Sequence, residues 1–278
     1  MTVLKRNGLC HHFRLTLLLA VVFVSSAHGA SSTDWGIWID RNVLRDGVEA
    51  RQIVRRCAEY GIGRLFPHTP FIEQAPGFWK QITIPLIDEC HRQGLEVHLW
   101  LDPITLASID GRHELMQLDL NGRETVLACP ANPEVRRLNI EKFVRIVKEH
   151  KIDGVHLEDC LIWRVVDDDH QVCYCDYCKK HAPIEQKNWT EWRVQKMNEY
   201  VHELGRAIKQ QDPRVQFSYA ARMPHASSMT MYTDWPAWCA SGDLDFVVPM
   251  CYRETTAEFI ELADDAVQAM AGIGTPVY

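Results

Sequence analysis

The sequence lacks a basic patch and, beyond residue 30, any long apolar run. A membrane-spanning helix needs about 20 consecutive apolar residues, so no later segment is long enough to cross a bilayer. The chain carries 37 Asp and Glu against 30 Lys and Arg, which gives a net charge of −7. An acidic chain without clustered cations is a poor partner for nucleic acid. A neutral partner such as a carbohydrate fits this composition better.

The sequence also lacks a glycine-rich turn after its first predicted strand, where Asp40, Arg41 and Asn42 stand instead. Doubly wound nucleotide-binding folds usually carry such a turn to hold phosphate. There is no HExxH spacing for a catalytic metal, no internal repeat and no low-complexity linker. We therefore expect one catalytic domain without an organic cofactor.

Residues 1–29 have the features of a secretory signal peptide. Lys5, Arg6 and Arg14 form a basic start, residues 15–24 an apolar centre, and residues 27–29 a small-residue exit. The apolar centre is too short for the alternative, a membrane anchor. Cleavage removes three cations and lowers the net charge from −7 to −10. We expect a secreted or periplasmic domain over residues 30–278 that does not contact the membrane; its oligomeric state is left open.

Apolar runs and amphipathic segments alternate along this domain. The predicted strands cover residues 35–40, 64–68, 96–102, 155–157, 215–222 and 244–252, and a seventh begins at 274–278. Helical periodicity is found at residues 48–60, 79–93, 192–210 and 258–270, and after Pro133. This alternation predicts a parallel sheet covered by helices. We expect a (β/α)8 TIM barrel truncated after the start of strand seven, with a doubly wound sheet as the alternative.

Acids stand where these strands end. Residues 153–159, DGVHLED, place Glu158 and Asp159 after a short buried strand, and Asp40 and Asp102 end two other strands. In such barrels the active site lies at the carboxyl ends of the strands. Glycoside cleavage needs two carboxyl groups on opposite sides of the bond, roughly 5–9 Å apart. Alternation sends Glu158 and Asp159 to different faces, so we expect Glu158 as acid/base with Asp40, Asp102 or an acid outside this chain as its partner.

Aromatic and polar side chains at the same strand ends are suited to binding sugar. Each also has a structural interpretation: Trp100 and Tyr219 as barrel packing, His68 as a satisfied core histidine, and Asp40 as a helix cap. The full predicted set is catalytic Glu158, Asp159 and Asp40, and substrate-binding His68, Trp100, Asp102, Tyr219, Arg222, Met250 and Tyr252.

Residues 161–190 form a predicted insertion with three crowded cysteines, Cys173, Cys175 and Cys178. Their spacing fits a metal better than disulfides, because cysteines this close rarely reach disulfide geometry with one another. Zinc takes four ligands, so a structural site needs a fourth from Cys129, Cys160, His170 or His181. The alternative is a set of disulfides from this cluster to Cys129 or Cys160.

Four segments in order resemble the glycosyl-hydrolase-like family 10 domain: residues 128–136 (ACPANPEVR), 153–159 (DGVHLED), 189–193 (WTEWR) and 246–252 (FVVPMCY). The resemblance covers residues 34–278 and implies a secreted TIM barrel of the sugar-hydrolase class. Where that family usually has Asp, this chain has Glu158. The CYCDYC run is also similar to the zinc cluster of family 42 β-galactosidases, and this resemblance implies Cys129 as the fourth ligand of a structural Zn²⁺.

These residues are compatible with three functions. The preferred one is a secreted glycoside hydrolase acting on an oligo- or polysaccharide. The second is a barrel that binds carbohydrate without cleaving it. The third is a metal-dependent hydrolase or deacetylase that uses His68, His98 and Asp102.

Overall fold

The computed structural model describes residues 35–44, 47–105, 109–159, 173–183 and 189–278. The predicted signal peptide lies outside these residues, as do parts of the predicted insertion. None of the helices within the described ranges combines the length and apolar content needed to span a membrane.

Six strands form one parallel sheet, and their order in space follows their order in the chain. The sheet runs β1-β2-β3-β6-β7-β8, and every neighbouring pair is parallel. A doubly wound sheet would reverse its strand order at a switch point, so this order excludes that alternative. The strands are β1 (Trp35–Ile39), β2 (Ile62–Pro67), β3 (Glu96–Leu101), β6 (Gly154–Leu157), β7 (Gln216–Arg222) and β8 (Phe246–Met250).

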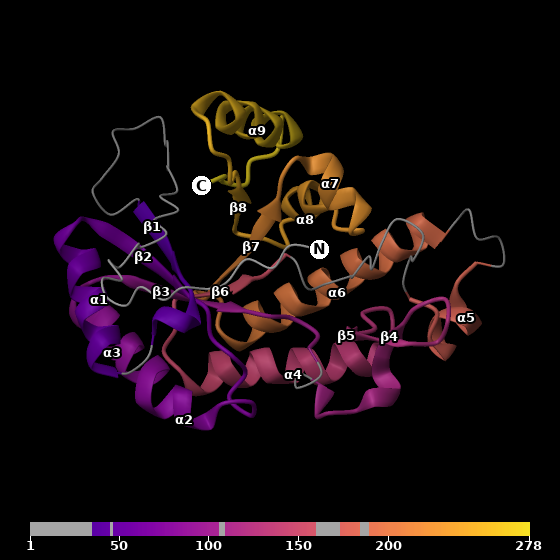
Figure 1. The fold of residues 1–278 in the computed structure, drawn as a ribbon, viewed down its shortest axis with the longest axis horizontal. Coiled ribbons are helices and arrows are strands. Elements are labelled where there is room, and N and C mark those ends of the chain that lie inside the picture. The colour runs from indigo at the N-terminus through magenta and orange to yellow at the C-terminus, as the bar shows by residue number, and fades with distance from the viewer. Residues whose placement is uncertain (1–34, 45–46, 106–108, 160–172, 184–188) are drawn as a thin grey trace, which may run out of the picture.

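Helices connect the strands and cover the outer side of this curved sheet (Figure 1). Helix α1 packs against α3, and helix α4 packs against α6. The helices are α1 (Gly47–Glu59), α2 (Pro76–Phe78), α3 (Ile84–Arg92), α4 (Pro133–Glu149), α5 (Asp176–His181), α6 (Trp189–Gln211), α7 (His225–Thr230), α8 (Trp235–Ala240) and α9 (Thr256–Ala269). Short non-α turns are η1 (Arg41–Val43), η2 (Trp79–Thr83) and η4 (His113–Leu115). The expected strand–helix alternation is confirmed, and the architecture is a parallel α/β half-barrel.

An antiparallel hairpin interrupts the pattern between β3 and α4. It consists of β4 (Met116–Leu118) and β5 (Glu124–Ala128). Its turn contains Gly122 at φ 77°, a backbone conformation that suits glycine, and the Gly122 N–H donates to Asp119 O at 3.1 Å. Asn121 and Gly122 therefore lie in the turn of this hairpin.

Residues 276–278 pair beside β8. Val277 forms a parallel bridge with Val247, and the Val247 N–H donates to Pro276 O at 3.1 Å. This places the predicted seventh strand segment next to the sixth strand of the sheet.

Gly154 permits the close approach of β3 and β6. It lies directly opposite His98, and a Cβ at residue 154 would overlap the His98 imidazole ring. Because His98 is fully buried, its ring has little room to move. We expect Gly154→Ala to lower the free energy of unfolding by about 1–3 kcal/mol, measured by urea denaturation. Gly77→Ala is the matched control, since nothing lies near its added Cβ; equal stability of the two variants would contradict the prediction.

Candidate active site

Alternate residues of the strands fill the concave side of the sheet. The His156 ring lies 4.7 Å from the Phe66 ring and 5.9 Å from the Trp38 ring. These residues come from β6, β2 and β1, so the side on which they meet is the interior of the curve. Because side chains alternate along a strand, His68 and Glu158, two residues further on, face the same interior at the carboxyl edge.

Glu158 follows β6 and lies beside Asp102, which follows β3. The two strands pair with Leu101 opposite Leu157, and the Glu158 N–H donates to Leu101 O at 3.2 Å. Asp102 and Glu158 are therefore cross-strand neighbours that face the same way, on strands that lie about 4.8 Å apart. Glu158 is 7% exposed. The register thus brings two acids from different strands together at the barrel mouth.

His68 connects β2 to this pair of acids. Its Nε2 lies 2.9 Å from Asp102 Oδ1, and its ring stacks on Trp100 with centroids 4.4 Å apart. The contact orients the Asp102 carboxylate toward β2. Three of the predicted substrate-binding residues therefore form one contiguous group beside Glu158.

Asp159 faces the other way and is fully buried. Its carboxylate accepts a hydrogen bond from the Tyr219 hydroxyl, and its Oδ2 lies 2.8 Å from Arg222 Nε. Burial raises the pKa of Asp159 to about 6, although the bonds from Tyr219 and Arg222 act in the opposite direction. The structure places Asp159 where it can orient Arg222, and away from the surface where a substrate would bind.

Tyr219 likewise points away from the mouth. It is fully buried and meets the Trp238 ring edge-on, with centroids 5.0 Å apart. The structural interpretation of Tyr219 as packing thus agrees with its place in the fold. Its hydroxyl serves Asp159, and through that carboxylate it supports Arg222.

The raised pKa of Asp159 has a consequence for stability. Between about pH 4 and pH 6 the folded protein holds a proton on Asp159 that the unfolded chain releases, so stability from this group is lost as the pH rises through that interval. We expect the unfolding free energy of Asp159→Asn, relative to wild type, to rise by about 2 kcal/mol between pH 4 and pH 7 in urea titrations.

The control is Asp212→Asn. The Arg214 guanidinium beside Asp212 lowers the pKa of that carboxyl to about 2, so its stabilising effect is constant above pH 4. A difference for Asp159→Asn that stays flat or falls with pH would contradict the assignment.

The remaining predicted site residues lie along the same edge. Asp40 is exposed and caps η1, where its Oδ1 accepts the Asn42 N–H at 2.7 Å. Met250 is half-buried at the end of β8, and Tyr252 is 54% exposed. Tyr252 meets the Trp38 ring edge-on at 6.3 Å. Asp40 thus has the capping position that its structural interpretation predicts.

Sequence reasoning missed a hydrogen-bond chain beneath the mouth. The Trp38 indole Nε1–H donates to His156 Nε2 at 3.0 Å. Since an indole can only donate, His156 Nε2 is an acceptor and the ring proton sits on Nδ1. That proton is donated to Ser218 Oγ at 2.8 Å, and the Ser218 hydroxyl in turn donates to Val155 O at 3.4 Å. Burial lowers the pKa of His156 well below its ordinary value, so the ring is neutral.

The four cysteines of the predicted metal site converge. Cys129 precedes α4. Cys173 and Cys175 precede α5, and Cys178 lies within it. Their sulfur atoms all lie within 4.8 Å of one another, and all four residues are buried. Cys129 Sγ and Cys178 Sγ are 3.4 Å apart, well beyond the roughly 2.05 Å of a disulfide.

This arrangement fits a metal ion. Four sulfurs around a tetrahedral centre with metal–sulfur bonds of about 2.3 Å lie close to these separations. The Cys175 N–H also donates to Cys173 Sγ at 3.4 Å, which fixes the position of that sulfur within the cluster. Cys129 therefore lies beside the three clustered cysteines, as expected.

The residues of the third hypothesis do not share one site. His68 contacts Asp102, whereas His98 lies deeper, fully buried between the Phe66 and Phe246 rings. Among the described residues, the four cysteines are the one set of three or more His, Cys, Asp or Glu side chains that lie close enough together to share a metal ion.

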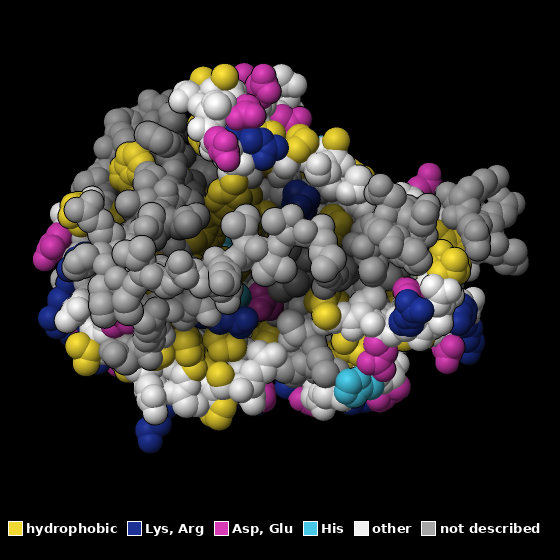
Figure 2. Space-filling model, viewed as in Figure 1, with side chains coloured by type: hydrophobic (Ala, Val, Ile, Leu, Met, Phe, Trp, Pro, Cys, Tyr) yellow, Lys and Arg dark blue, Asp and Glu magenta, His cyan; other side chains and the backbone are white. Residues whose placement is uncertain are grey.

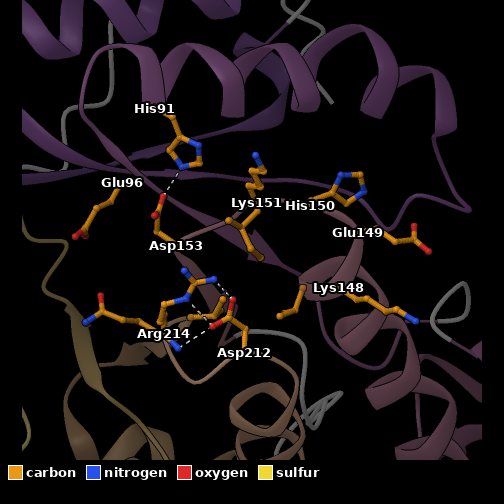
Figure 3. A pocket seen from close by; sticks show the side chains of 13 residues that line it. His91, Glu96, Lys148, Glu149, His150, Lys151, Asp153, Asp212 and Arg214 are labelled. Atoms are coloured by element: carbon orange, nitrogen blue, oxygen red, sulfur yellow. Dashed lines mark hydrogen bonds and ion pairs between the residues drawn. The ribbon is translucent and has the colours of Figure 1, made fainter.

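A cavity of about 850 Å³ opens at the opposite, amino-terminal end of the strands (Figure 3). Two ion pairs lie in its walls: His91 Nε2 lies 2.8 Å from Asp153 Oδ2, and Arg214 Nη2 lies 2.7 Å from Asp212 Oδ2. Asp153 also accepts the Val97 N–H at 2.8 Å, which ties it to the sheet. Acids and partly exposed aromatic residues gather instead at the carboxyl end of the strands.

The structure is a parallel α/β half-barrel with neighbouring acids and aromatic rings at its carboxyl edge, the edge at which barrel enzymes carry their active sites. The chain belongs to the glycosyl hydrolase-like 10 family, whose model matches residues 80–277. This result confirms the resemblance found in its sequence.

A curated protein is similar in sequence to part of this chain. The chain is 24% identical over 196 residues to glycosyl hydrolase YngK of Bacillus subtilis (strain 168), covering 60% of this chain and 38% of that protein. The chain thus spans well under half the length of this curated relative.

Solved structures share the fold. The glycoside hydrolase domain of PgaB (BpsB) from Bordetella bronchiseptica superposes with a TM-score of 0.60 at 14% identity, covering 85% of this chain and 80% of that one. A β-galactosidase from Halorubrum lacusprofundi gives a TM-score of 0.53 at 16% identity, over 78% of this chain and 40% of that one.

Proposed function

We propose that this protein is a secreted glycosidase that cleaves an oligo- or polysaccharide at the carboxyl edge of its half-barrel. The observation that carries the proposal is the register between β3 and β6, which sets Asp102 beside Glu158 on the interior face. Family membership and the glycoside hydrolase neighbours support it.

The chemistry needs two carboxyl groups in different states. One protonates the departing glycosidic oxygen, and the other attacks the sugar or activates water, at roughly 5–9 Å from the first. Glu158 is proposed as the proton donor. Asp102 is proposed as the second group because its contact with His68 fixes its orientation. Strands about 4.8 Å apart fit the shorter of these separations.

Arg222 and His68 flank the two acids. Arg222 is held by buried Asp159 and can bind a substrate hydroxyl from β7. His68 is held by Asp102 and Trp100 on the opposite side. These side chains would orient a sugar across Glu158.

Three further features belong to the same proposal. The signal peptide directs the chain out of the cytoplasm, and residues 30–278 form a catalytic domain of the TIM-barrel class. The four cysteines hold one zinc ion in a closed protein shell, which stabilises the fold and leaves no open position for activating water.

The test is the release of reducing sugar from a panel of oligosaccharides by the purified protein, with Glu158→Gln beside it. Release by wild type and loss in the variant support hydrolysis. Binding of a glycan without release by wild type would favour the second function, a carbohydrate-binding barrel. Equal release by both proteins would exclude Glu158 as the proton donor.

A further inference from the structure

Trp38 lies on the interior face of the sheet near the mouth and was not among the residues expected there. It lies on β1, is half-buried, and its alternation places it one step below Asp40 on the interior face. The centroids of the Trp38 and Phe66 rings lie 6.2 Å apart. The Trp38 ring also meets the Tyr252 ring edge-on, at an interplanar angle of 61°. On the face viewed in Figure 2, hydrophobic side chains gather in the central hollow below α9.

The orientation of the Trp38 indole is fixed from beneath. Its N–H is donated to His156 Nε2, and the ordered chain through Ser218 to Val155 O defines which nitrogen of His156 accepts it. The bond to His156 satisfies the indole N–H and at the same time gives the ring one orientation. Fixing a ring before binding reduces the conformational entropy that a ligand must overcome.

Trp38 and Tyr252 offer two aromatic surfaces at a steep angle to each other. Tyr252 is 54% exposed, so its ring is available to solvent. The electron-rich face of an aromatic ring attracts the weakly positive C–H groups on one face of a pyranose. Hydroxyl groups on the same sugar can then reach acids and cations at the strand ends, such as Glu158 and Arg222.

We infer that Trp38 and Tyr252 form a binding subsite for one pyranose ring of a saccharide, with His156 and Ser218 as positioning residues for Trp38. The inference rests on the proposed function for the identity of the ligand as a sugar, and it deepens that function by assigning where a ring is held. The subsite binds through ring faces and does not require a charged sugar.

The experiment measures binding in a Glu158→Gln background, so that turnover does not consume the ligand. The probes are cellohexaose, maltohexaose, chitohexaose and a printed array of neutral glycans, with affinity measured by calorimetry on the members that bind. We expect Trp38→Leu and Tyr252→Ala each to weaken binding by about tenfold or more. Tyr60→Ala is the matched control, since Tyr60 is 83% exposed at the end of α1, and its affinity should equal that of the parent.

Two further variants keep the inference testable if Trp38→Leu fails to fold. Trp38→Phe retains a ring and loses the bond to His156, so it should bind between the parent and Tyr252→Ala. Ser218→Ala removes the acceptor of the His156 proton and should weaken binding in a protein that remains folded, with a melting temperature a few degrees lower because the buried N–H loses its partner. Folded Tyr252→Ala with parental affinity, or a parent that binds none of the probes, would overturn the inference.

The outcomes separate this inference from the proposed function. If the parent binds a glycan through Trp38 and wild type releases no product, the subsite stands and hydrolysis fails. If wild type hydrolyses a glycan and Trp38→Leu retains its KM, hydrolysis stands and the subsite fails.

Discussion

Replacement of Glu158 by glutamine is expected to lower the turnover of an oligosaccharide by about 100- to 10,000-fold, because the amide cannot protonate the departing oxygen. The amide keeps the shape of the side chain and removes only its acidic proton. Glu158 is nearly buried beside Asp102, so a proton donated from it would not be supplied easily by water. The measurement is kcat on whichever panel member wild type cleaves best.

Asp102→Asn should cause a loss of similar size, since it removes the second carboxylate while leaving a hydrogen bond to His68 possible. Glu59→Gln is the control: Glu59 is exposed at the end of α1 and should not affect kcat. Melting curves of all three variants show whether each remains folded. Turnover by Glu158→Gln within a few-fold of wild type, with the protein folded, would remove Glu158 from the mechanism.

Loss of the metal is expected to have the largest effect on stability. Without an ion, four buried thiols that converge within 4.8 Å lose the bonds that hold α5 against the start of α4. Metal binding to such a shell is coupled to folding. We expect chelation, or Cys129→Ser, to lower the melting temperature by about 10 °C or more.

Elemental analysis accompanies the melting curves. Wild type should carry one zinc per chain, and Cys129→Ser should carry none or bind it weakly. Cys251→Ser is the control, because Cys251 is half-buried after β8 and outside the cluster. A purified protein without metal whose four cysteines are oxidised, shown by intact mass before and after reduction, would support the disulfide alternative.

Much of the fold could be predicted because apolar runs and helical periodicity alternate so regularly. The strand ends at Asp102 and Glu158 followed from those runs alone, and their parity follows from the period of two. The same parity sends Asp159 and Tyr219 toward the helices, and the structure places both there. The predicted site nevertheless included both residues, because each stands near the end of a strand. The structure places Asp159 behind the mouth, where it contacts Tyr219 and Arg222.

The hydrogen-bond chain at Trp38 could not be predicted in this way. Its partners His156 and Ser218 are distant in sequence from Trp38 and from each other. The register of β6 and β7 sets His156 opposite Ser218, and the curvature of the sheet brings Trp38 of β1 across to His156. The alternation did place Trp38 on the same face as Asp40, so its position was predictable even though its partner was not. The pairing of Asp102 with His68 depended on register in the same way.

The cysteine cluster also joins two excursions of the chain. Cys129 belongs to the segment that leaves the sheet after β3, and Cys173, Cys175 and Cys178 to the one that leaves after β6. These are the same two strands that present Asp102 and Glu158. An ion bound by the four sulfurs would therefore link the segments that follow these two strands. The distance between the two acids would then depend on whether the ion is bound.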